Sequence, residues 1–350
     1  MTTPLRIAVI GAGAFGRQHI ERLTKEKLCA LAGLADPAPA ARDVAASLGV
    51  PWRADAADLL DAVKPDGVIV ATPNALHVPV GLACVARKLP MLVEKPIAET
   101  VAGARELVDA AERAGVTLMV GHHRRYNPII ARARAIVQEG RLGRLTAVTA
   151  LWLVKKPDPY FETAWRREKG GGPILINLIH DIDDLRFIAG EITEVSAFTA
   201  NAARGFPVED SAAIALRFAG GAIGTITVSD AVAAPWNWEI ASGEYAMYAH
   251  EDENCYLFAG TEGALAVPRM ELWRYPGERG WTSPLARERI MLEPVDPQVA
   301  QLRHFCRVIG GTEAPLITGA DAARTLAATL AVRRSAETGR AVALDGPDPA

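Results

Sequence analysis

The setting of one histidine raises the first question about chemistry. His180 closes the segment GGGPILINLIHDID (residues 170–183), in which three glycines precede an apolar run. An imidazole titrates near neutral pH, so a histidine here can serve as a general acid or base. The alternative is a core histidine with a satisfied hydrogen bond. If the segment from Pro173 is helical, Ile176 and Asn177 share the face of His180, and Asn177 is the nearest polar residue on it.

A lysine at the end of an apolar segment is the second candidate. Lys95 follows PMLVE (90–94) and precedes Pro96, a position that favours a cleft over open solvent. There its ammonium can hydrogen-bond a reacting oxygen and help to stabilise developing negative charge. Taken alone, a lysine at a strand end is more often a surface residue.

The segment GAGAFG (11–16) fits the pattern G-x-G-x-x-G. It lies between a predicted strand and a predicted helix, the context that a dinucleotide-binding turn requires. In such a turn Gly11 permits the tight bend, Gly13 lets the backbone approach a pyrophosphate, and Gly16 lets helix and strand pack closely. Free N–H groups at the helix start attract the phosphates. The predicted cofactor residues of this loop are Gly11, Gly13, Ala14, Phe15 and Gly16.

Asp36 ends the second predicted strand and suits the ribose of a dinucleotide. A carboxylate there accepts hydrogen bonds from the ribose hydroxyls and repels a 2′-phosphate, which favours NAD over NADP. The alternative is that Asp36 only starts the Asp-Pro turn. Arg42, a few residues later, leaves room for NADP.

The loop ATPNALH (71–77) follows another predicted strand. In doubly wound sheets ligands bind beyond the carboxyl ends of the strands. We therefore expect Thr72, Pro73 and Asn74 to line the ribose or nicotinamide of the cofactor. An ordinary strand-to-helix turn with Asn74 as its cap is the alternative.

Two different rhythms divide the chain. Up to about residue 121, short apolar runs alternate with helical stretches, which predicts parallel βαβ units and a doubly wound α/β sheet. From about residue 145, consecutive strands predict a mainly antiparallel sheet. The runs of the first part lie at 5–10, 29–36, 66–72, 90–94 and 116–121, and those of the second at 145–154, 194–201, 211–221 and 222–232, with a hairpin turn at 219–222.

The predicted domains follow from this change of rhythm. Residues 1–121 form a nucleotide-binding domain, on which a helix at about 319–340 packs back, and residues 122–318 form a domain for substrate and oligomer contacts. The Gly-Arg ending of that helix is typical of a C-terminal cap.

Bulk properties narrow the class of protein. The 350 residues carry a formal charge of −3, which offers no field to attract nucleic acid or an anionic membrane. No signal-peptide pattern or membrane-spanning apolar stretch is found, so we expect a cytoplasmic protein. The scattered cysteines predict buried thiols and neither a disulfide framework nor a metal site: Cys29, Cys84, Cys255 and Cys306.

An ordered set of motifs resembles the glucose–fructose oxidoreductase/inositol dehydrogenase (Gfo/Idh/MocA) family. The resemblance covers nearly the whole chain and implies an N-terminal Rossmann domain and a C-terminal α/β domain with a large, mainly antiparallel sheet. Members mostly oxidise or reduce a carbinol or carbonyl of sugars, inositols and related polyols with NAD or NADP. The motifs are GAGAFG, ADP (35–37), ATPNALH, EKP (94–96), GHHRRYNP (121–128), GGGPILINLIHDID and the final SAETGR.

The resemblance assigns roles residue by residue. It implies that Lys95 contacts the reacting hydroxyl and that His180 is the general acid/base. Asn74 and His77 correspond to the cofactor-side loop, and Glu94 to a neighbour of the nicotinamide. Relatives place a substrate- or nicotinamide-contacting arginine at Arg125, with Tyr126 and Asn127 beside it.

One position departs from the family pattern. Many polyol dehydrogenases of the family carry an aspartate four residues before the histidine, where this chain has Ile176. Asn177 can hold a hydroxyl by hydrogen bonds but cannot act as a base. After His180, we expect Asp183 to be a structural hydrogen-bond acceptor and Asp181 and Asp184 to be solvated or ion-paired.

Aromatic residues of the second part are further substrate candidates. Trp236 and Trp238 could stack on the apolar face of a sugar ring while Glu239 binds paired hydroxyls, or both tryptophans could belong to the sheet core or an oligomer interface. Tyr160, Trp165 and Arg166 could form a lid. The predicted substrate contacts are Arg125, Tyr160, Trp165, Asn177, His180 and Trp236.

The leading prediction is an NAD(P)-dependent dehydrogenase or reductase acting on a CH–OH or C=O group of a sugar, inositol or polyol. A redox-assisted glycosidase that recycles its NAD is the second reading, and a non-catalytic dinucleotide sensor the third. A sensor would need neither Lys95 nor His180. Because relatives often bury the open face of the large sheet between subunits, we expect a homo-dimer or homo-tetramer.

Overall fold

The computed structural model describes residues 3–344, which form two compact units. The first comprises residues 3–126 and 295–326, and the second residues 127–294 and 327–344. The division falls inside helix α10 (Gly319–Thr338). Residues 295–318, which the sequence analysis placed in the second domain, lie here in the first unit, because α9 (Pro297–Ile309) packs against α1 (Ala14–Lys25).

The first unit is built on a sheet of six strands in the order β3-β2-β1-β4-β5-β6, and every pair in it is parallel. The predicted doubly wound sheet is therefore confirmed. Only β3, with two residues, has no counterpart among the predicted strands. The strands are β1 (Leu5–Ile10), β2 (Cys29–Ala35), β3 (Trp52–Arg53), β4 (Gly67–Val70), β5 (Met91–Val93) and β6 (Leu118–Val120).

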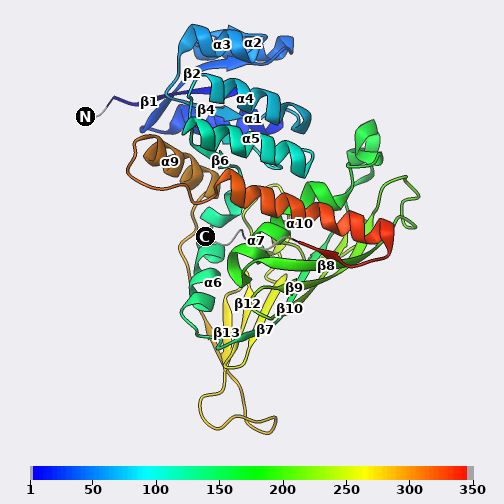
Figure 1. Cartoon of the computed structure of the whole chain (residues 1–350). Helices are drawn as coiled ribbons and strands as arrows, with labels where there is room; N and C mark the ends of the chain where they lie inside the picture. Colours follow the sequence, from blue (N-terminus) through cyan, green and yellow to red (C-terminus); the bar gives the residue numbers. More distant parts are fainter. Residues whose placement is uncertain (1–2, 345–350) are drawn as a thin grey trace. The chain divides into compact units, whose positions relative to one another are not determined.

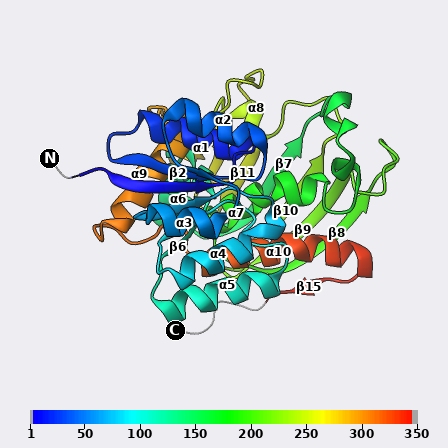
Figure 2. The same ribbon diagram turned by 90° about the horizontal axis from the view of Figure 1, so that it is seen from above.

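Helices cover both faces of this sheet. Figure 2 shows α1 and α2 (Pro39–Leu48) on one side of the strands and α3 (Ala56–Val63), α4 (His77–Ala86) and α5 (Val101–Ala114) on the other. Side chains of α1, α2 and α9 pack with Ile7, Val9 and Leu34 of the strands in one apolar cluster. Because both faces are buried, the strands read as continuous apolar runs and not as alternating ones.

The second unit contains a nine-stranded sheet in the order β14-β13-β12-β11-β7-β10-β9-β8-β15. The predicted mainly antiparallel sheet is confirmed, and β7 with β10 is the parallel pair within it. The strands are β7 (Leu145–Leu153), β8 (Ile192–Ala200), β9 (Ser211–Phe218), β10 (Ile223–Ser229), β11 (Tyr256–Gly260), β12 (Ala264–Val267), β13 (Glu271–Arg274), β14 (Ala286–Arg289) and β15 (Val342–Ala343).

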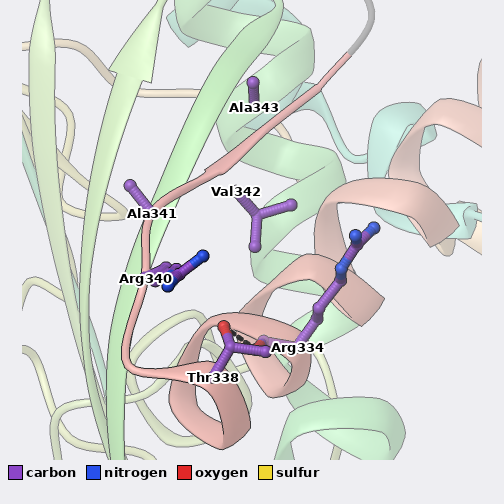
Figure 3. A pocket seen from close by; sticks show the side chains of 6 residues that line it. All are labelled: Arg334, Thr338, Arg340, Ala341, Val342 and Ala343. Atoms are coloured by element: carbon purple, nitrogen blue, oxygen red, sulfur yellow. Dashed lines mark hydrogen bonds between the residues drawn. The ribbon is translucent and has the colours of Figure 1, made fainter.

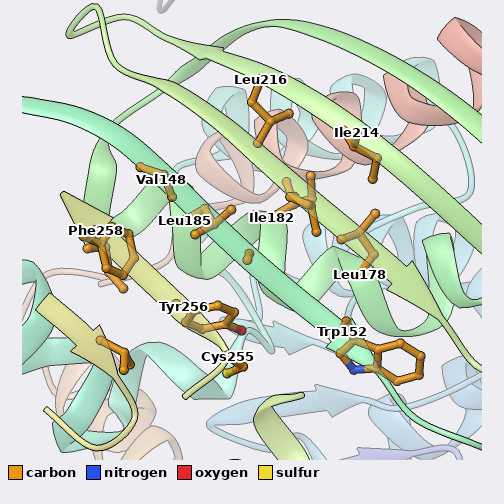
Figure 4. Packing of buried hydrophobic residues seen from close by; sticks show 14 of the residues in the cluster. Val148, Trp152, Leu178, Ile182, Leu185, Ile214, Leu216, Cys255, Tyr256 and Phe258 are labelled. Atoms are coloured by element: carbon orange, nitrogen blue, oxygen red, sulfur yellow. The ribbon is translucent and has the colours of Figure 1, made fainter. Parts of the chain in front are cut away.

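Helices cover one face of this second sheet. α6 (Pro128–Gln138), α7 (Ile179–Ala189) and the C-terminal part of α10 contribute to its apolar core, and α7 and α10 are seen along β8 to β10 in Figure 1. Figure 4 shows Leu178, Ile182 and Leu185 packed against the inward side chains of the strands. Gly339, at a φ of 65°, follows α10 as the predicted Gly-Arg ending requires.

Short elements complete the described chain. They are η1 (Asn74–Leu76), η2 (His123–Tyr126), η3 (Asp158–Glu162), η4 (Ala164–Arg167), the π-helical turn η5 (Ile174–Leu178) and α8 (Trp238–Ala241). All four cysteines are buried free thiols. Between residues 3 and 344, no helix has both the length and the apolarity needed to cross a membrane.

A buried hydrogen bond joins α1 to the end of β5. Glu94 follows β5, and its Oε1 lies 2.7 Å from Nε2 of His19 on α1, with both side chains nearly sealed from solvent. Burial would raise the pKa of Glu94, but the hydrogen bond and charge of His19, with the charges of His123 and Lys95, hold it at about 2. The carboxylate therefore stays ionised and contributes to stability.

Replacing this carboxylate should give a pH-dependent loss of stability. A folded pKa of about 2, against 4.5 for the free group, stabilises the native state above pH 4.5, and the contribution is lost as pH falls towards 2. We expect Glu94→Gln to lower the free energy of unfolding by about 3 kcal/mol at pH 7, from 1.36 kcal/mol per pKa unit. Urea unfolding at pH 7 and pH 3 measures it; exposed Glu99→Gln is the control. A difference independent of pH would contradict the assignment.

Candidate active site

The glycine-rich loop has the geometry predicted for a dinucleotide turn. Gly11 has a φ of 96°, and a Cβ there would lie 2.4 Å from the carbonyl oxygen of Ala71, so only glycine fits. A Cβ on Gly16 would lie 2.0 Å from the oxygen of Gly11. At Gly13, by contrast, a Cβ would meet nothing within 4 Å. The loop is thus packed tightly on its protein side and open at the position where backbone would face a ligand.

Asp36 lies where the sequence predicted, directly after β2, and is half-buried. Its Oδ2 accepts a hydrogen bond from the backbone N–H of Ala12 at 2.7 Å, and its Oδ1 accepts one from Ala38 at 2.8 Å. The second contact is the Asp-Pro turn that we weighed as an alternative, and the first ties Asp36 to the glycine loop. Each oxygen retains a lone pair, so the ribose role and the turn are compatible.

The loop after β4 contains an unsatisfied hydroxyl. Oγ1 of Thr72 is buried, and within the described part of the chain it has no hydrogen-bond partner. A buried polar atom without a partner is uncommon in native proteins and indicates a missing ligand or water. Pro73 is exposed and Asn74 half-buried at the start of η1. The open space at Gly13 and the hydroxyl of Thr72 both fit a bound dinucleotide.

His77 connects two loops at this edge of the sheet. Its Nδ1 lies 2.7 Å from the carbonyl oxygen of Pro96, and its Nε2 lies 3.0 Å from that of Thr72. Burial lowers the pKa of His77, while the two carbonyl contacts oppose that effect. Because both ring nitrogens face protein atoms, we infer that His77 positions the cofactor-side loop and the EKP loop relative to each other.

Lys95 is half-buried beside the glycine loop. Its Nζ lies 5.7 Å from the centroid of the Phe15 ring, at cation–π distance, and its backbone N–H donates to Oε2 of Glu94 at 3.3 Å. Phe15 itself is 44% exposed, so the ammonium reaches the mouth of the loop. The Lys95 ammonium therefore lies beside one of the predicted cofactor residues, whereas its placement in a cleft stays a prediction.

Arg125 is buried within the first unit and forms an ion pair with Asp321 of α10. Tyr126 packs edge-on against His304, with ring centroids 5.5 Å apart. Asn127 caps α6, since its Oδ1 accepts from the N–H of Ile129. These contacts give all three residues structural roles, which leaves the substrate role of Arg125 a prediction.

In the second unit, His180 is 8% exposed and lies one turn after an irregular helix start. The segment from Pro173 is helical as predicted, but its first turn is the π-helical η5, a feature often found at functional sites. The glycines allow this start. A Cβ on Gly172 would lie 2.3 Å from Oε1 of Glu209, which accepts from the N–H of Ile174 at 3.3 Å.

The acidic residues after His180 are not solvated. Asp181 and Asp184 are both fully buried, so of the two predicted alternatives, solvent contact and ion pairing, solvent contact was wrong. The hydroxyl of Tyr256 donates to Oδ1 of Asp181, and Oδ2 of Asp184 lies 3.3 Å from the same hydroxyl oxygen. Asp183 is also buried, at 1% exposure. The start of α7 thus carries carboxylates into the core, beside the tyrosine hydroxyl of β11.

A buried lysine near His180 was missed from the sequence. Lys156 follows β7, and its Nζ donates to Oδ1 of Asn177 at 2.8 Å and lies 3.4 Å from Oδ2 of Asp230. Desolvation lowers the pKa of Lys156, while the charges of Asp230 and Glu239 oppose that effect. Inward and outward side chains alternate along β7, with Val148, Ala150 and Trp152 inward. The same alternation places Lys156 inward, so it could have been predicted to be buried.

The loop before the glycines contains stacked cations and rings. The guanidinium of Arg166 lies 4.0 Å from the centroid of the Tyr160 ring, and its Nη1 donates to the backbone carbonyl oxygen of Tyr160 at 2.8 Å. Nζ of Lys156 lies 4.8 Å from the same ring. Trp165 is 51% exposed. Tyr160 is thus held near Asn177, while Trp165 is available to a ligand, as a lid residue would be.

The tryptophans after β10 have different fates. Trp238 is fully buried, and its ring stacks on that of Tyr256 with the ring centroids 5.9 Å apart. It therefore belongs to the sheet core. Trp236 is 42% exposed and stays a candidate substrate contact. Glu239 is 7% exposed and accepts from Nε1 of Trp152 at 3.0 Å.

A cavity of about 540 Å³ lies at the end of α10 in the second unit (Figure 3). None of the residues predicted for cofactor or substrate lines it. Figure 3 shows the side chains of Arg334 and Arg340 beside β15, and Thr338 donates to the oxygen of Arg334. The full lining is Arg334, Thr338, Arg340, Ala341, Val342 and Ala343.

Two family descriptions match the chain. Residues 5–122 match the oxidoreductase family with an NAD-binding Rossmann fold, and residues 130–266 match the GFO/IDH/MocA C-terminal domain. The first unit is thus an NAD-binding domain of an oxidoreductase, in agreement with the glycine loop and Asp36.

Characterised relatives agree with this assignment. The 1,5-anhydro-D-fructose reductase of Ensifer adhaerens is 32% identical over 80% of each chain. Inositol 2-dehydrogenase of Arthrobacter sp. (strain FB24) is 33% identical over 59% of this chain and 61% of its own. The chain spans about three fifths of the length of several other curated relatives it matches.

A solved structure covers the whole fold. GenD2 from gentamicin A biosynthesis, in complex with NAD, is 27% identical, with a TM-score of 0.78 over 99% of this chain and 98% of its own. Sequence motifs, both family matches and the fold therefore converge. The chain belongs to the GFO/IDH/MocA family of NAD-binding oxidoreductases.

Proposed function

We propose that this protein is an NAD(P)-dependent dehydrogenase or reductase acting on a CH–OH or C=O group of a sugar, inositol or related polyol. The observation that carries the proposal is the placement of the Lys95 ammonium over Phe15 of the glycine loop. A cation held there lies beside the group that the loop would bind. The names of the relatives, a sugar reductase and an inositol dehydrogenase, support the substrate class.

Two residues take the chemical roles in this proposal. Lys95 donates a hydrogen bond to the reacting oxygen and lowers the cost of its developing negative charge. His180 takes the hydroxyl proton when the substrate is oxidised and returns it when a carbonyl is reduced. The nicotinamide, when bound, supplies or accepts the hydride. Burial of His180 to 8% exposure suits a proton acceptor that must be shielded from bulk water.

Loss of either residue should remove turnover without removing cofactor binding. With a panel of inositols, aldoses, deoxy-sugars and sugar acids, the wild type should change the absorbance of the nicotinamide with at least one compound. Lys95→Ala and His180→Ala should each lower kcat by roughly 10²- to 10⁴-fold. NADH binding, followed by fluorescence, should stay within a few-fold. Exposed Lys27→Ala and His250→Ala are the matched controls; full activity of His180→Ala would refute its role.

Asp36 should set the preference between the two dinucleotides. Its negative charge repels a 2′-phosphate, so we expect Asp36→Asn to lower the ratio of NAD to NADP affinity by about tenfold or more. The amide keeps an acceptor for the N–H of Ala12, which separates the loss of charge from a loss of loop structure. Asp36→Ala removes both and should weaken both dinucleotides. Titration with NADH and NADPH measures the ratios, and an unchanged ratio would contradict the prediction.

The outer face of the second sheet suits self-association, and we propose that the chain forms homo-oligomers through it. Outward residues in the middle of β9 and β10 are small and uncharged, with Ala213 opposite Thr227 and Ala215 opposite Thr225, while the outward Arg217 near the end of β9 pairs with Glu194 of β8. Phe198 is 79% exposed beside them on β8. Small uncharged side chains beside an exposed aromatic ring suit a protein–protein contact.

A charge in the middle of this face should disrupt the oligomer. Light scattering after size exclusion should give the wild type at a multiple of the 37.3 kDa chain mass, and Thr225→Lys at the single-chain mass. The buried ammonium would have no partner in the contact. Ser47→Lys, on an exposed position of α2, should behave as wild type. A wild type at 37.3 kDa would overturn the proposal.

A further inference from the structure

Lys156 is a lysine whose hydrogen bonds are all directed at protein groups. Its side chain is 11% exposed, between Asn177, the carboxylate of Asp230 and the rings of Trp152 and Tyr160. Asp230 is held on its other side by Arg204, whose Nε donates to Oδ1 at 2.9 Å. A lysine enclosed in this way is not a mobile surface charge, and its position is set by the end of β7.

The contact with Asn177 fixes the orientation of the amide. An ammonium has three donors and no acceptor, so the group 2.8 Å from Nζ must be the oxygen of the amide and not its NH₂. Nδ2 of Asn177 then points away from Lys156. Across residues 3–344, Nδ2 forms no hydrogen bond, and Asn177 is only half-buried. The amide therefore offers a donor, three residues before His180.

We propose that Lys156 is a positioning residue that fixes the Asn177 amide as a hydrogen-bond donor to substrate, so that the site prefers a sugar acid over the neutral sugar with the same ring. The proposal rests on the proposed function, because it names the substrate class for the site that contains His180. It assigns to Lys156 a role that neither the family matches nor the predicted site residues contain.

Three features of the site favour an anionic oxygen. Ile176 brings no carboxylate to this turn, so no negative charge from that position repels a substrate carboxylate. The ammonium bound to Oδ1 polarises the amide and strengthens the donor at Nδ2. Hydrogen bonds to a charged acceptor are stronger than those to a neutral hydroxyl. A carboxylate, which only accepts, suits an amide edge that only donates.

The two buried carboxylates near Asn177 already accept hydrogen bonds from protein groups. Asp230 is occupied by Lys156 and Arg204, and Glu239 by Nε1 of Trp152. Both carboxylates are less than 10% exposed. Their charges keep the lysine in place, whereas Asn177 is half-buried and so partly open to solvent.

The test compares D-glucuronate with D-glucose, which share a ring and differ in a carboxylate. Titration calorimetry with NADH present measures binding without turnover. We expect the wild type to bind glucuronate about tenfold more tightly than glucose. Lys156→Met should remove this preference, and Lys156→Arg, which keeps a donor-only cation, should retain it. Asn177→Asp should reverse it, because its carboxylate repels that of the substrate.

Controls separate this role from a structural one. Lys155→Met changes the exposed neighbour of Lys156 and should leave the preference unchanged. Where turnover is measurable, Lys156→Met should raise KM for glucuronate and leave kcat and the KM for glucose near wild-type values. A structural role would instead lower kcat for both sugars. Thermal unfolding of each variant identifies those that fail to fold; Asn177→Asp, which stays near-isosteric and can still accept from Lys156, then decides the question.

The outcomes distinguish the two proposals. The role of Lys156 would be overturned if the wild type bound the two sugars equally or bound neither of them. It would also be overturned if Lys156→Met kept the preference for glucuronate, or if Lys156→Arg lost it. A tenfold preference, with no turnover of NAD or NADP by any compound of the panel above, would support the role of Lys156 and refute the dehydrogenase.

Discussion

Parallel pairing of β1 with β2 on one side and with β4 on the other determines where polar residues of the first unit can lie. Because all six strands run the same way, their carboxyl ends meet at one edge of the sheet, and both faces are covered by helices. Gly11, Asp36, Thr72 and Glu94 each follow a strand at that edge. The apolar strands leave no other place for these groups, so the order of the sheet and the cofactor residues are two aspects of one constraint.

The second unit differs in that charged side chains are buried next to its apolar core. One face of its sheet is covered by α6, α7 and the end of α10, and the residues near His180 lie on that covered side. Charged groups are stable there only with partners. Lys156 and Arg204 are the partners of Asp230. The hydroxyl of Tyr256 is a partner of Asp181. The half-buried amide of Asn177 is where this network reaches its edge.

Much of the first unit could be predicted from the sequence because glycines and strand ends leave strong local signals. Five of the strands, the glycine loop and the position of Asp36 follow from spacing alone. The second unit depends more on contacts between distant residues. Whether Trp238 or Trp236 is buried depends on β11, and whether Asp181 meets solvent depends on Tyr256, 75 residues later.

Other features could not be read from sequence for identifiable reasons. The π-helical turn before His180 depends on the approach of Glu209 to Gly172, and no local pattern announces it. The pair of His19 with Glu94 joins a helix and a strand end that are 75 residues apart. Lys156 was missed although its signal was present, because the alternation of β7 was not followed beyond the strand. The remaining site roles depend on a bound substrate and stay predictions.

The two carbonyl contacts of His77 have a consequence for protein engineering. One ring joins the loop that ends β4 to the loop that carries Lys95, through the oxygens of Thr72 and Pro96. The two loops are therefore a single transplantable part, although 19 positions separate His77 from Pro96. A chimera that took one of these loops from a relative and kept the other would lose the fit between the His77 ring and the two carbonyl oxygens. Exchanging the whole stretch from Thr72 to Pro96 would keep that fit intact.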